Sequence, residues 1–357
     1  MEMSVLGVLV VVFMSFLGCF QLGLSQSEVY MKAFITWDDM KVDEGRARLS
    51  SRDNYNRSRV IVVDKNGGGD SLTVQGAIDM VPENNIGRVK IYVLPGIYRE
   101  KVLVPRTKPY ISLIGQEGQI YDTIITWNSK ASDTDSNGVE LGTYRSASVT
   151  IESDYFCATG ITFENTVVAV PGGYGMQAVA LRVSGEKAFF YKVRMLGTQD
   201  TLLDETGSHY FYQCHIQGSV DFIFCWCLEQ DCILQSTAKK TGAIAAHRRD
   251  SPYDDTGFSF VGCVINGTGK VLLGRAWGNY SRAIYSFCNF DHIIIPAGWS
   301  DWNNPYRQKT VVFGEYECSG RGADIRGRVP WLKTFTYEEV KPFLGMQFIN
   351  GDQWLKL

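Results

Sequence analysis

Two carboxylates and two carboxamides recur at a constant interval in the middle of the sequence. Gln177, Gln199 and Asp221 follow one another at intervals of 22 residues, and Asp200 directly follows Gln199. Such a set could hydrolyse an ester, with one carboxylate as nucleophile or base, the other as acid, and the amide N–H groups stabilising an oxyanion. The same residues could instead form a solvated polar ladder, because stacked Asn and Gln side chains stabilise parallel strands.

Other patterns that would support catalysis or metal binding are missing from the sequence. We find no G-x-S-x-G nucleophile elbow, no dinucleotide-binding glycine motif and no phosphate-binding loop. None of the four histidines accompanies an obvious Ser or Cys nucleophile. Cys225, Cys227 and Cys232 form a compact group, but no His follows at zinc-site spacing. We therefore expect neither a metal ion nor a cofactor.

An internal repeat predicts the strands that would bring the polar residues together. Each copy has apolar residues at offsets of three and five from an aromatic residue, and the fuller copies add a glycine at seven. The copies are Phe190-Val193-Met195-Gly197, Phe211-Cys214-Ile216-Gly218, Phe260-Cys263-Ile265-Gly267 and the shorter Tyr285-Cys288-Phe290. Short strands recurring after 21 residues, without helical periodicity between them, favour an all-β parallel β-helix, in which neighbouring coils lie ~4.8 Å apart.

An antiparallel sandwich is the alternative fold for the repeat. It requires hairpin turns between neighbouring strands, and only Asn266-Gly267 offers one within the repeats. Near the far end, Tyr337–Leu344 predicts a short helix that contains Pro342. We expect this terminal element to cover the open end of the solenoid, whose strand edges must not be exposed.

The charge balance and the N-terminus limit the class of protein. The 357-residue chain has a formal net charge of −3 and no long basic block, which argues against a nucleic-acid partner. An apolar run at Val5–Phe20 is shorter than the ~20 residues of a membrane span and resembles the core of a signal peptide. We predict a signal peptide at 1–25, a segment of unclear role at 26–59 and one catalytic domain at 60–357. An uncleaved N-terminal anchor is the alternative.

Five short motifs identify a family. They are Gly96-Ile97-Tyr98-Arg99-Glu100 (GxYxE), Gln177-Ala178-Val179-Ala180-Leu181 (QAVAL), Gly197-Thr198-Gln199-Asp200-Thr201-Leu202 (GxQDTL), Asp221-Phe222-Ile223-Phe224 (the first four places of DFIFG) and Leu273-Gly274-Arg275-Ala276-Trp277 (LGRxW). One such motif alone is weak evidence, but five in the same order are specific. The chain resembles plant pectin methylesterases along nearly all of its mature length. Among them it resembles the short type without an inhibitor-like pro-region, and in particular quartet-type members linked to pollen separation.

The resemblance implies a fold, a reaction and a role for each site residue. The fold would be a single-stranded, right-handed parallel β-helix that acts as a monomer in the plant cell wall (apoplast). It would remove methyl esters from the homogalacturonan of pectin and release methanol. The resemblance assigns these roles: Asp221 as nucleophile, Asp200 as general acid and then base, Gln177 and Gln199 as oxyanion donors, Arg275 as partner of the Asp221 carboxylate, Trp277 as a platform for a sugar ring and Thr143 as a substrate contact.

Two departures from the family pattern lie next to Asp221. Cys225 replaces the glycine of DFIFG, which would strain the backbone if that position required a positive φ. The stretch 221–232 is also about two residues shorter than in the family, so we expect a displaced Asp221 and a loss of up to ~100-fold in rate. Alternatively, these departures mark an error of splicing or gene prediction.

Two other functions remain open on the sequence alone. One is a pectin-binding wall protein that has lost its activity, which the departures beside Asp221 would explain. The other is a polygalacturonase-like hydrolase, for which the acidic pair Asp254-Asp255 is the only hint.

Secretion gives the first testable prediction. The protein isolated from plant tissue should begin near Gln26 and carry N-glycans at one or more of the sequons at Asn56, Asn266 and Asn279. N-terminal sequencing and glycosidase treatment measure both properties. An unglycosylated cytosolic protein that begins at Met1 would contradict the prediction. Eight cysteines would remain in the mature chain, which permits disulfides in that compartment without requiring them.

Overall fold

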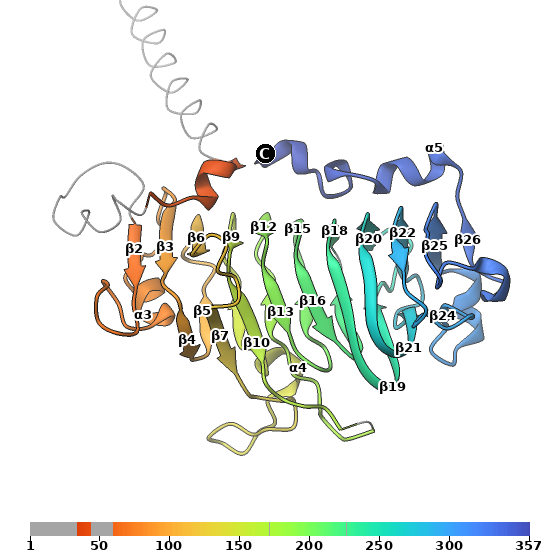
Figure 1. Ribbon diagram of the computed structural model, residues 1–357, viewed down its shortest axis with the longest axis horizontal. Helices are drawn as coiled ribbons and strands as arrows, with labels where there is room; N and C mark the ends of the chain where they lie inside the picture. The colour runs from red at the N-terminus through yellow and green to blue at the C-terminus, as the bar shows by residue number, and fades with distance from the viewer. Residues whose placement is uncertain (1–33, 44–59, 171, 226) are drawn as a thin grey trace, which may run out of the picture.

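A computed structural model describes residues 34–43 and 60–357, apart from residues 171 and 226. The predicted signal peptide at 1–25 and most of the segment at 26–59 lie outside the described residues. The chain winds into a parallel β-helix, in which successive coils stack side by side along the long axis of the molecule (Figure 1). Each central coil contributes one strand to an 11-stranded sheet and then one strand to each of the two arms of a 14-stranded sheet. The predicted parallel β-helix is therefore confirmed.

The 11-stranded sheet forms one complete side of the β-helix. Its strands, in spatial order, are β2 (Val60–Val63), β3 (Val89–Val93), β6 (Ile111–Gly115), β9 (Cys157–Thr159), β12 (Ala188–Tyr191), β15 (His209–Tyr212), β18 (Leu228–Gln230), β20 (Phe258–Val261), β22 (Arg282–Ser286), β25 (Val312–Tyr316) and β26 (Lys333–Thr334). Every neighbouring pair is parallel, which a solenoid requires because each strand returns one coil later in the same direction.

The 14-stranded sheet forms the other two sides. Its first arm contains β4 (Gly96–Arg99), β7 (Thr123–Trp127), β10 (Thr162–Asn165), β13 (Arg194–Leu196) and β16 (His215–Gly218). Its second arm contains β5 (Val102–Val104), β8 (Val149–Ile151), β11 (Leu181–Val183), β14 (Leu202–Asp204) and β17 (Val220–Cys225). The long strands β19 (Ile233–His247) and β21 (Val264–Ala276) join the two arms, and β23 (Asn289–Phe290) and β24 (Trp299–Ser300) pair with β21.

The sequence repeat corresponds to ladders of side chains inside the β-helix. Phe190 pairs with Phe211, and their rings stack with centroids 4.6 Å apart. Phe260 pairs with Tyr285 in the same way, with centroids 4.3 Å apart. All four side chains are fully buried. The candidate hairpin turn at Gly267 is instead an interior residue of β21, so the antiparallel alternative is wrong.

One place in the interior stack holds a carboxyl group in place of a ring. Glu229 pairs with Phe211 on one side and with Phe260 on the other, and its side chain is fully buried. The sequence repeat did not reveal this copy, because a charged residue replaces its aromatic residue. The coil between Tyr210 and its partner Leu228 is also short. It has three residues fewer than the preceding coil, between Phe189 and its partner Tyr210.

The cysteines of the repeat stack one above another in the interior. The ladder consists of Cys214, Cys232, Cys263, Cys288 and Cys318, each with its thiol directed at a backbone carbonyl of the preceding coil. None of the cysteines whose side chains the structure describes forms a disulfide. The ladder therefore contributes small apolar side chains to the core.

Residues 34–40 and the C-terminal segment cover the outer face of the 11-stranded sheet (Figure 1). Residue Ile35 of β1 (Ile35–Thr36) pairs with Leu355 of β27 (Leu355–Lys356), which brings the described part of the N-terminal segment against the C-terminus. These residues pack with Trp354 on outward-facing apolar residues of the sheet. Among the described residues, no helix combines the length and apolar character that crossing a bilayer requires.

The predicted C-terminal helix is present, but its expected position is wrong. It is divided into α5 (Tyr337–Val340) and the 3₁₀ helix η5 (Lys341–Phe343), because the proline at position 342 cannot continue an α-helix. The segment runs back along the side of the β-helix, where the Phe343 carbonyl accepts a hydrogen bond from Ser259 on β20. It therefore covers the apolar outer face of the sheet and does not close the open end.

Short helices occupy the remaining connections. They are η1 (Trp37–Met40), α3 (Val74–Asp79), α4 (Gly142–Arg145), η3 (Pro305–Lys309), η4 (Ile325–Gly327), η6 (Met346–Ile349) and η7 (Gly351–Gln353). The loop that carries α4 projects from the bottom of the β-helix in Figure 1. Loops of this kind are the usual place for substrate contacts on a rigid scaffold.

Glu229 belongs to a buried polar cluster. Its Oε1 accepts a hydrogen bond of 2.7 Å from the Cys227 thiol, and in the preceding coil Asp204 is paired with Nδ1 of His209. Oε2 of Glu229 and Oδ2 of Asp204 have no hydrogen-bond partner among the described residues. Burial raises the pKa of Glu229 well above its ordinary value, and the nearby Asp204 raises it further. The carboxyl of Glu229 is therefore held protonated in the folded protein.

This cluster predicts that stability falls as the pH rises. The unfolded Glu229 carboxyl loses its proton near its ordinary pKa of 4.5, whereas the folded one retains it. Stability then decreases by up to about 1.4 kcal/mol per pH unit above that value, until the folded carboxyl also ionises. Glu229→Gln should remove this part of the pH dependence and raise stability at pH 7. Urea unfolding at several pH values measures it.

The exposed Glu317 provides the control for this measurement. Glu317→Gln should keep the pH dependence of the wild type, because it removes an exposed carboxyl that lies outside the buried cluster. If Glu229→Gln and the wild type lost the same free energy of unfolding between pH 5 and pH 7, Glu229 would not be the group that takes up the proton.

Candidate active site

Asp221 occupies an irregular position at the start of β17. Its φ is +46°, and the register of β17 against β19 shifts between Val220 and Ile223. The shift is a β-bulge, a feature that redirects a side chain and is frequent beside active sites. A non-glycine residue in the left-handed region costs about 1–3 kcal/mol, which the surrounding ladder must hold in place. Asp221 is only 7% exposed.

The other residues of the 22-residue series lie on the preceding coils. Gln199 forms a parallel bridge with Val220, and its carbonyl accepts a 3.1 Å hydrogen bond from the N–H of Ala178, the neighbour of Gln177. Asp200 has a φ of +62° and donates its N–H to the Val220 carbonyl at 3.2 Å. The backbone therefore stacks all three positions of the series, as their spacing predicted. Within the described part of the chain, neither glutamine side chain forms a hydrogen bond, so both amides can serve a bound molecule.

Arg275 holds the Asp221 carboxylate. Its Nε donates to Oδ1 of Asp221 at 2.7 Å, and its Nη2 donates to Oδ2. Trp302 lies over the other face of the guanidinium, 3.9 Å from the ring centroid. Sequence reasoning predicted the ion pair from the family resemblance but missed Trp302, which follows β24 and carries no motif of its own. The bidentate pair and the stacked ring together fix the direction of the Asp221 side chain.

The two carboxyl groups of the site differ in their affinity for a proton. Burial raises the pKa of Asp200 well above its usual range, and the charge of Asp221 raises it further. Burial also raises the pKa of Asp221, but the hydrogen bonds and charge of Arg275 oppose this effect. Of the two groups, Asp200 is therefore the one that keeps its proton and Asp221 the one that ionises.

Backbone hydrogen bonds connect the loop that carries Thr143 to the coil of Gln177. It lies in α4, and the N–H of Gly142 donates to the carbonyl of Ala131 at 2.9 Å. The N–H of Ala131 in turn donates to the carbonyl of Gln177 at 2.8 Å. This connection ties the projecting α4 loop to the coil that carries Gln177.

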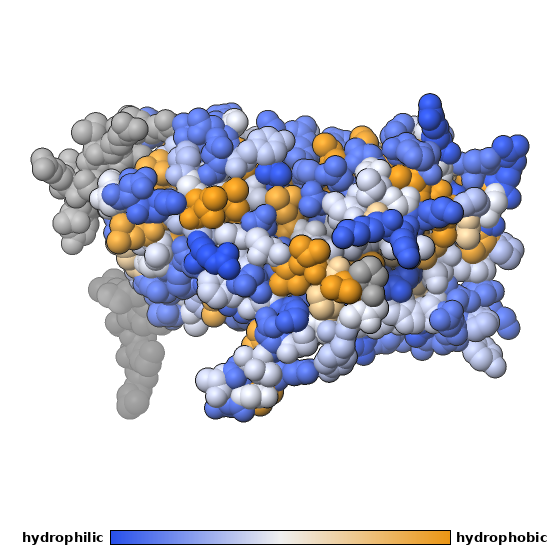
Figure 2. Space-filling view, turned by 60° about the horizontal axis from the view of Figure 1, so that its bottom comes forward, coloured by the Kyte–Doolittle hydropathy of each residue, from blue (hydrophilic) through white to orange (hydrophobic). Residues whose placement is uncertain are grey.

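Trp277 lies in an apolar patch on the outer face of the second arm. Its ring packs on Phe224 with a centroid distance of 6.5 Å, and the guanidinium of Arg248 lies over it at 5.6 Å. The patch continues through the buried outward-facing residues Leu203 and Val179. Figure 2 turns the lower edge of the β-helix toward the viewer and shows apolar side chains in a broken band along the long axis. Within the described part of the chain, the Trp277 side chain makes no hydrogen bond or ring contact with Asp200, Asp221 or Arg275.

The short coil does not displace Asp221, so that expectation is wrong. Leu202 pairs with Ile223 at the same interval at which Leu181 pairs with Leu202, and the regular register continues to the pair Asp204–Cys225. The missing residues therefore lie after Cys225, in the connection from β17 to β18. Cys225 itself ends β17, where its backbone pairs in parallel with Asp204.

Metal ligation and histidine catalysis find no support in the site. Among residues 34–43 and the described part of 60–357, no group of three or more His, Cys, Asp and Glu side chains is arranged to hold a metal ion. Cys227 and Cys232 are both buried in the interior of the β-helix. Burial lowers the pKa of His247 to about 3, so its ring is uncharged and accepts a hydrogen bond from the Arg282 N–H.

Comparison with known sequences identifies the family. The family model described as Pectinesterase matches residues 60–352. Pectinesterase QRT1 of Arabidopsis thaliana is 62% identical over 346 residues, covering 92% of this chain and 91% of the relative. Probable pectinesterase 8 of the same plant is 41% identical over 307 residues, covering 83% and 76% of the two chains. The chain belongs to the pectinesterase family, and the predicted quartet-type resemblance is confirmed.

Solved structures support the same assignment. Pectin methylesterase from carrot superposes with a TM-score of 0.77 at 32% identity, covering 85% of this chain and 96% of that one. Pectin methylesterase from Aspergillus niger superposes with a TM-score of 0.72 at 26% identity, covering 85% and 98% of the two chains. The predicted enzyme class, pectinesterase, agrees with the family model, the relatives and the fold.

The ion pair predicts how the pKa of Asp221 responds to mutation. Arg275→Gln removes the positive charge and the bidentate hydrogen bonds but leaves the carboxyl buried, so the pKa of Asp221 should rise. Carbon-13 NMR of carboxyl-labelled aspartate measures the titration, and Asp221→Asn assigns the signal. Arg248→Gln is the matched control, because it removes a nearby guanidinium that does not contact Asp221. An unchanged pKa in Arg275→Gln would contradict the assigned role of the ion pair.

Proposed function

We propose that this protein hydrolyses the methyl esters of galacturonic acid residues in pectin, with Asp221 as nucleophile and Asp200 as general acid and base. One arrangement carries the proposal: Arg275 holds the Asp221 carboxylate through two hydrogen bonds and opposes the rise of its pKa, whereas burial and the charge of Asp221 both raise the pKa of Asp200. Ester hydrolysis by two carboxyl groups needs this difference in protonation.

In the first half of the proposed reaction, the Asp221 carboxylate attacks the ester carbonyl. The amides of Gln177 and Gln199 donate hydrogen bonds to the oxyanion of the tetrahedral intermediate. Asp200 gives its proton to the departing methoxy oxygen, so that neutral methanol leaves. The product is an anhydride between Asp221 and the galacturonic acid carboxyl group.

In the second half, Asp200 is ionised and accepts a proton from water. The resulting nucleophile attacks the anhydride, the bond to Asp221 breaks and the free galacturonic acid carboxyl group is released, which then loses its proton to the solvent. Both aspartates return to their starting states, and no cofactor is needed for the balance of atoms or charge. Arg275 stabilises Asp221 each time it becomes a free carboxylate.

The substrate of this reaction is the methyl-esterified homogalacturonan of the cell wall. Phe224, which shares strand β17 with Asp221, packs with Trp277 in an apolar patch that would serve as a platform for sugar rings, and Thr143 on the α4 loop would add a substrate contact. We further propose that the protein is secreted to the apoplast and acts as a monomer. The domain limits then follow the predicted signal peptide at 1–25 and the catalytic β-helix at 60–357.

Two alternative functions make different predictions. A polygalacturonase would cut glycosidic bonds and need carboxyl groups about 6.5–9.5 Å apart with room for water. Its only sequence hint, Asp254 and Asp255, lies in an exposed loop between β19 and β20, which disfavours it. A pectin-binding protein without activity was suggested by the short coil, but the regular pairing with the preceding coil on both sides of Asp221 argues against it.

Methanol release from highly methylated pectin tests the proposal. Wild-type protein should release methanol without new reducing ends, and Asp221→Asn or Asp200→Asn should abolish the release while the circular dichroism spectrum stays unchanged. Gln177→Ala should lose about 10²–10³ in kcat, as expected for removal of one oxyanion donor.

Asp255→Asn serves as the control variant for these measurements. Its carboxyl is exposed and far from the reacting groups, so its rate should equal that of the wild type. Activity near the wild-type level in Asp221→Asn would show that another group is the nucleophile. New reducing ends would show that the enzyme cuts the polymer.

A further inference from the structure

A groove of about 740 Å³ runs along the outside of the β-helix, away from the candidate active site. It follows the corner at which each coil leaves the 11-stranded sheet and enters the first arm of the 14-stranded sheet. Asp200 and Asp221 lie at the next corner, between the first and second arms. The groove is therefore a separate surface feature, and none of the site residues lines it.

The groove is long in the direction in which the coils stack. It is lined by residues from six consecutive coils, Tyr92, Ile114, Thr159, Tyr191, Gln213 and Asp231. Because neighbouring parallel strands lie ~4.8 Å apart, five steps correspond to a length of about 24 Å. Such a shape suits a linear polymer better than a compact small molecule.

Aromatic rings line this groove. Tyr121 is 65% exposed, and the Arg194 guanidinium lies 4.2 Å from its ring centroid. Trp37, from the N-terminal segment, packs edge-on against Tyr191 at 4.9 Å and forms part of the opposite wall. Rings of this kind bind the apolar faces of sugars through packing, while their polar groups remain available for hydrogen bonds.

Three cations also line the groove. Lys41, Lys192 and Arg194 outnumber the anions Glu117 and Asp231, although the whole chain has a net charge of −3. Nε of Arg194 is shielded from water and has no hydrogen-bond partner among the described residues. Its Nη1 has only a long hydrogen bond of 3.4 Å, to the Thr162 hydroxyl. Glu164 lies near enough to interact with this guanidinium electrostatically, but no ion pair joins Arg194 to a carboxylate among the described residues.

We propose that this groove binds de-esterified galacturonan, a linear anionic polysaccharide. Its sugar rings would pack on Tyr121, Trp37 and Tyr191, and its carboxylates would lie against Lys192 and Arg194. The identity of the polymer rests on the proposed function, because de-esterified galacturonan is the product of that reaction. The groove keeps the enzyme on stretches that it has already de-esterified, while the active site faces neighbouring esterified chains.

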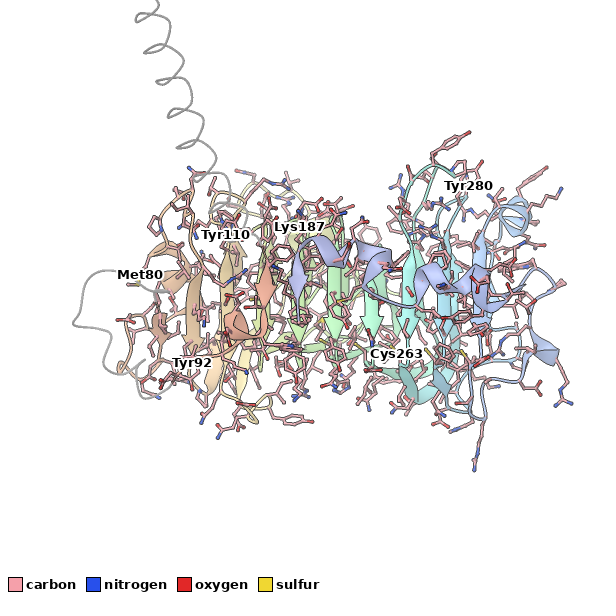
Figure 3. All side chains as sticks on the ribbon, turned by 90° about the horizontal axis from the view of Figure 1, so that it is seen from above. Met80, Tyr92, Tyr110, Lys187, Cys263 and Tyr280 are labelled. Atoms are coloured by element: carbon pink, nitrogen blue, oxygen red, sulfur yellow. The ribbon has the colours of Figure 1, made fainter. Side chains whose placement is uncertain are left out.

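Two lysines at the ends of β12 provide a matched pair of variants. Lys192 follows β12 with a φ of +51°, and its Nζ lies 4.9 Å from the ring centroid of Tyr191. Lys187 precedes β12 with a φ of +64°, and its Nζ lies 5.0 Å from the ring centroid of Tyr155. Only Lys192 lines the groove. In Figure 3, Lys187 lies on the opposite edge of the 11-stranded sheet from Tyr92, a lining residue of the groove.

Affinity electrophoresis in gels that contain fully de-esterified polygalacturonate tests the proposal on the full-length protein. Lys192→Glu should raise the dissociation constant for polygalacturonate about fivefold, which is the effect of one exposed charge contact. Arg194→Gln should raise it at least as much. Lys187→Glu makes the same change of charge on the other edge and should bind like the wild type. Thermal unfolding verifies that the variants are folded. If Arg194→Gln is unstable, Lys192→Glu still tests the proposal, because this substitution is at the surface.

Equal retardation of Lys192→Glu and Lys187→Glu would overturn the proposal. So would a dimer that Lys192→Glu alone disrupts, because the groove would then belong to a second copy of the chain. Methanol release from a methylated trigalacturonate, too short to reach both surfaces, separates this test from the proposed function. Lys192→Glu should leave that rate unchanged. If the protein released no methanol but its retardation still depended on Lys192, the proposed function would be wrong. The proposed binding groove would still be supported.

Discussion

The parallel register between neighbouring coils is the constraint on which the structure depends. Each coil is hydrogen-bonded to the next along the strands, so a residue of one coil is fixed within ~4.8 Å of its counterpart in the next. This constraint places Gln177, Gln199 and Asp221 above one another, although 22 positions in the sequence separate each residue from the next. It also supports the positive φ values of Asp200 and Asp221, because the strands on either side hold both backbones in an unfavourable region.

A change in coil length is absorbed where the register permits it. The short coil keeps the pairs from Leu202–Ile223 to Asp204–Cys225 and loses its residues in the connection that follows. The consequence lies in the interior and not in the active site, because Glu229 occupies the place of a ring in the aromatic stack. A buried, protonated carboxyl group replaces stacking between coils, which costs stability and leaves the Asp221–Arg275 pair intact.

Much of the fold and of the candidate site could be predicted from the sequence. The features that could not be predicted have physical reasons. The repeat at Phe190 and Phe211 predicts the fold, because a side-chain ladder requires equal residues at equal intervals. The motifs around Asp200, Asp221 and Arg275 predict which residues meet. Three features depend on tertiary contacts and have no local signal: Trp302 over Arg275, the cluster around Glu229, and the course of the C-terminal segment along the sheet. Counting residues between Asp221 and Cys232 showed that the coil is short, but only the strand register shows on which side of Cys225 the residues are missing.

The turnover number of the unmodified chain, compared with that of a variant with two residues inserted after Cys225, tests the central claim most directly. If the register already holds Asp221 beside Arg275 and Asp200, the unmodified protein should release methanol at ordinary enzyme rates, about 1–10³ s⁻¹. This insertion restores the family's length at 221–232, although the coil is three residues shorter than the one before it. It should change kcat by less than about tenfold, since a displacement of ~1 Å would cost ~100-fold. An unmodified protein that is nearly inactive, together with a gain of about 100-fold or more on insertion, would contradict this account and show that the short coil misplaces Asp221.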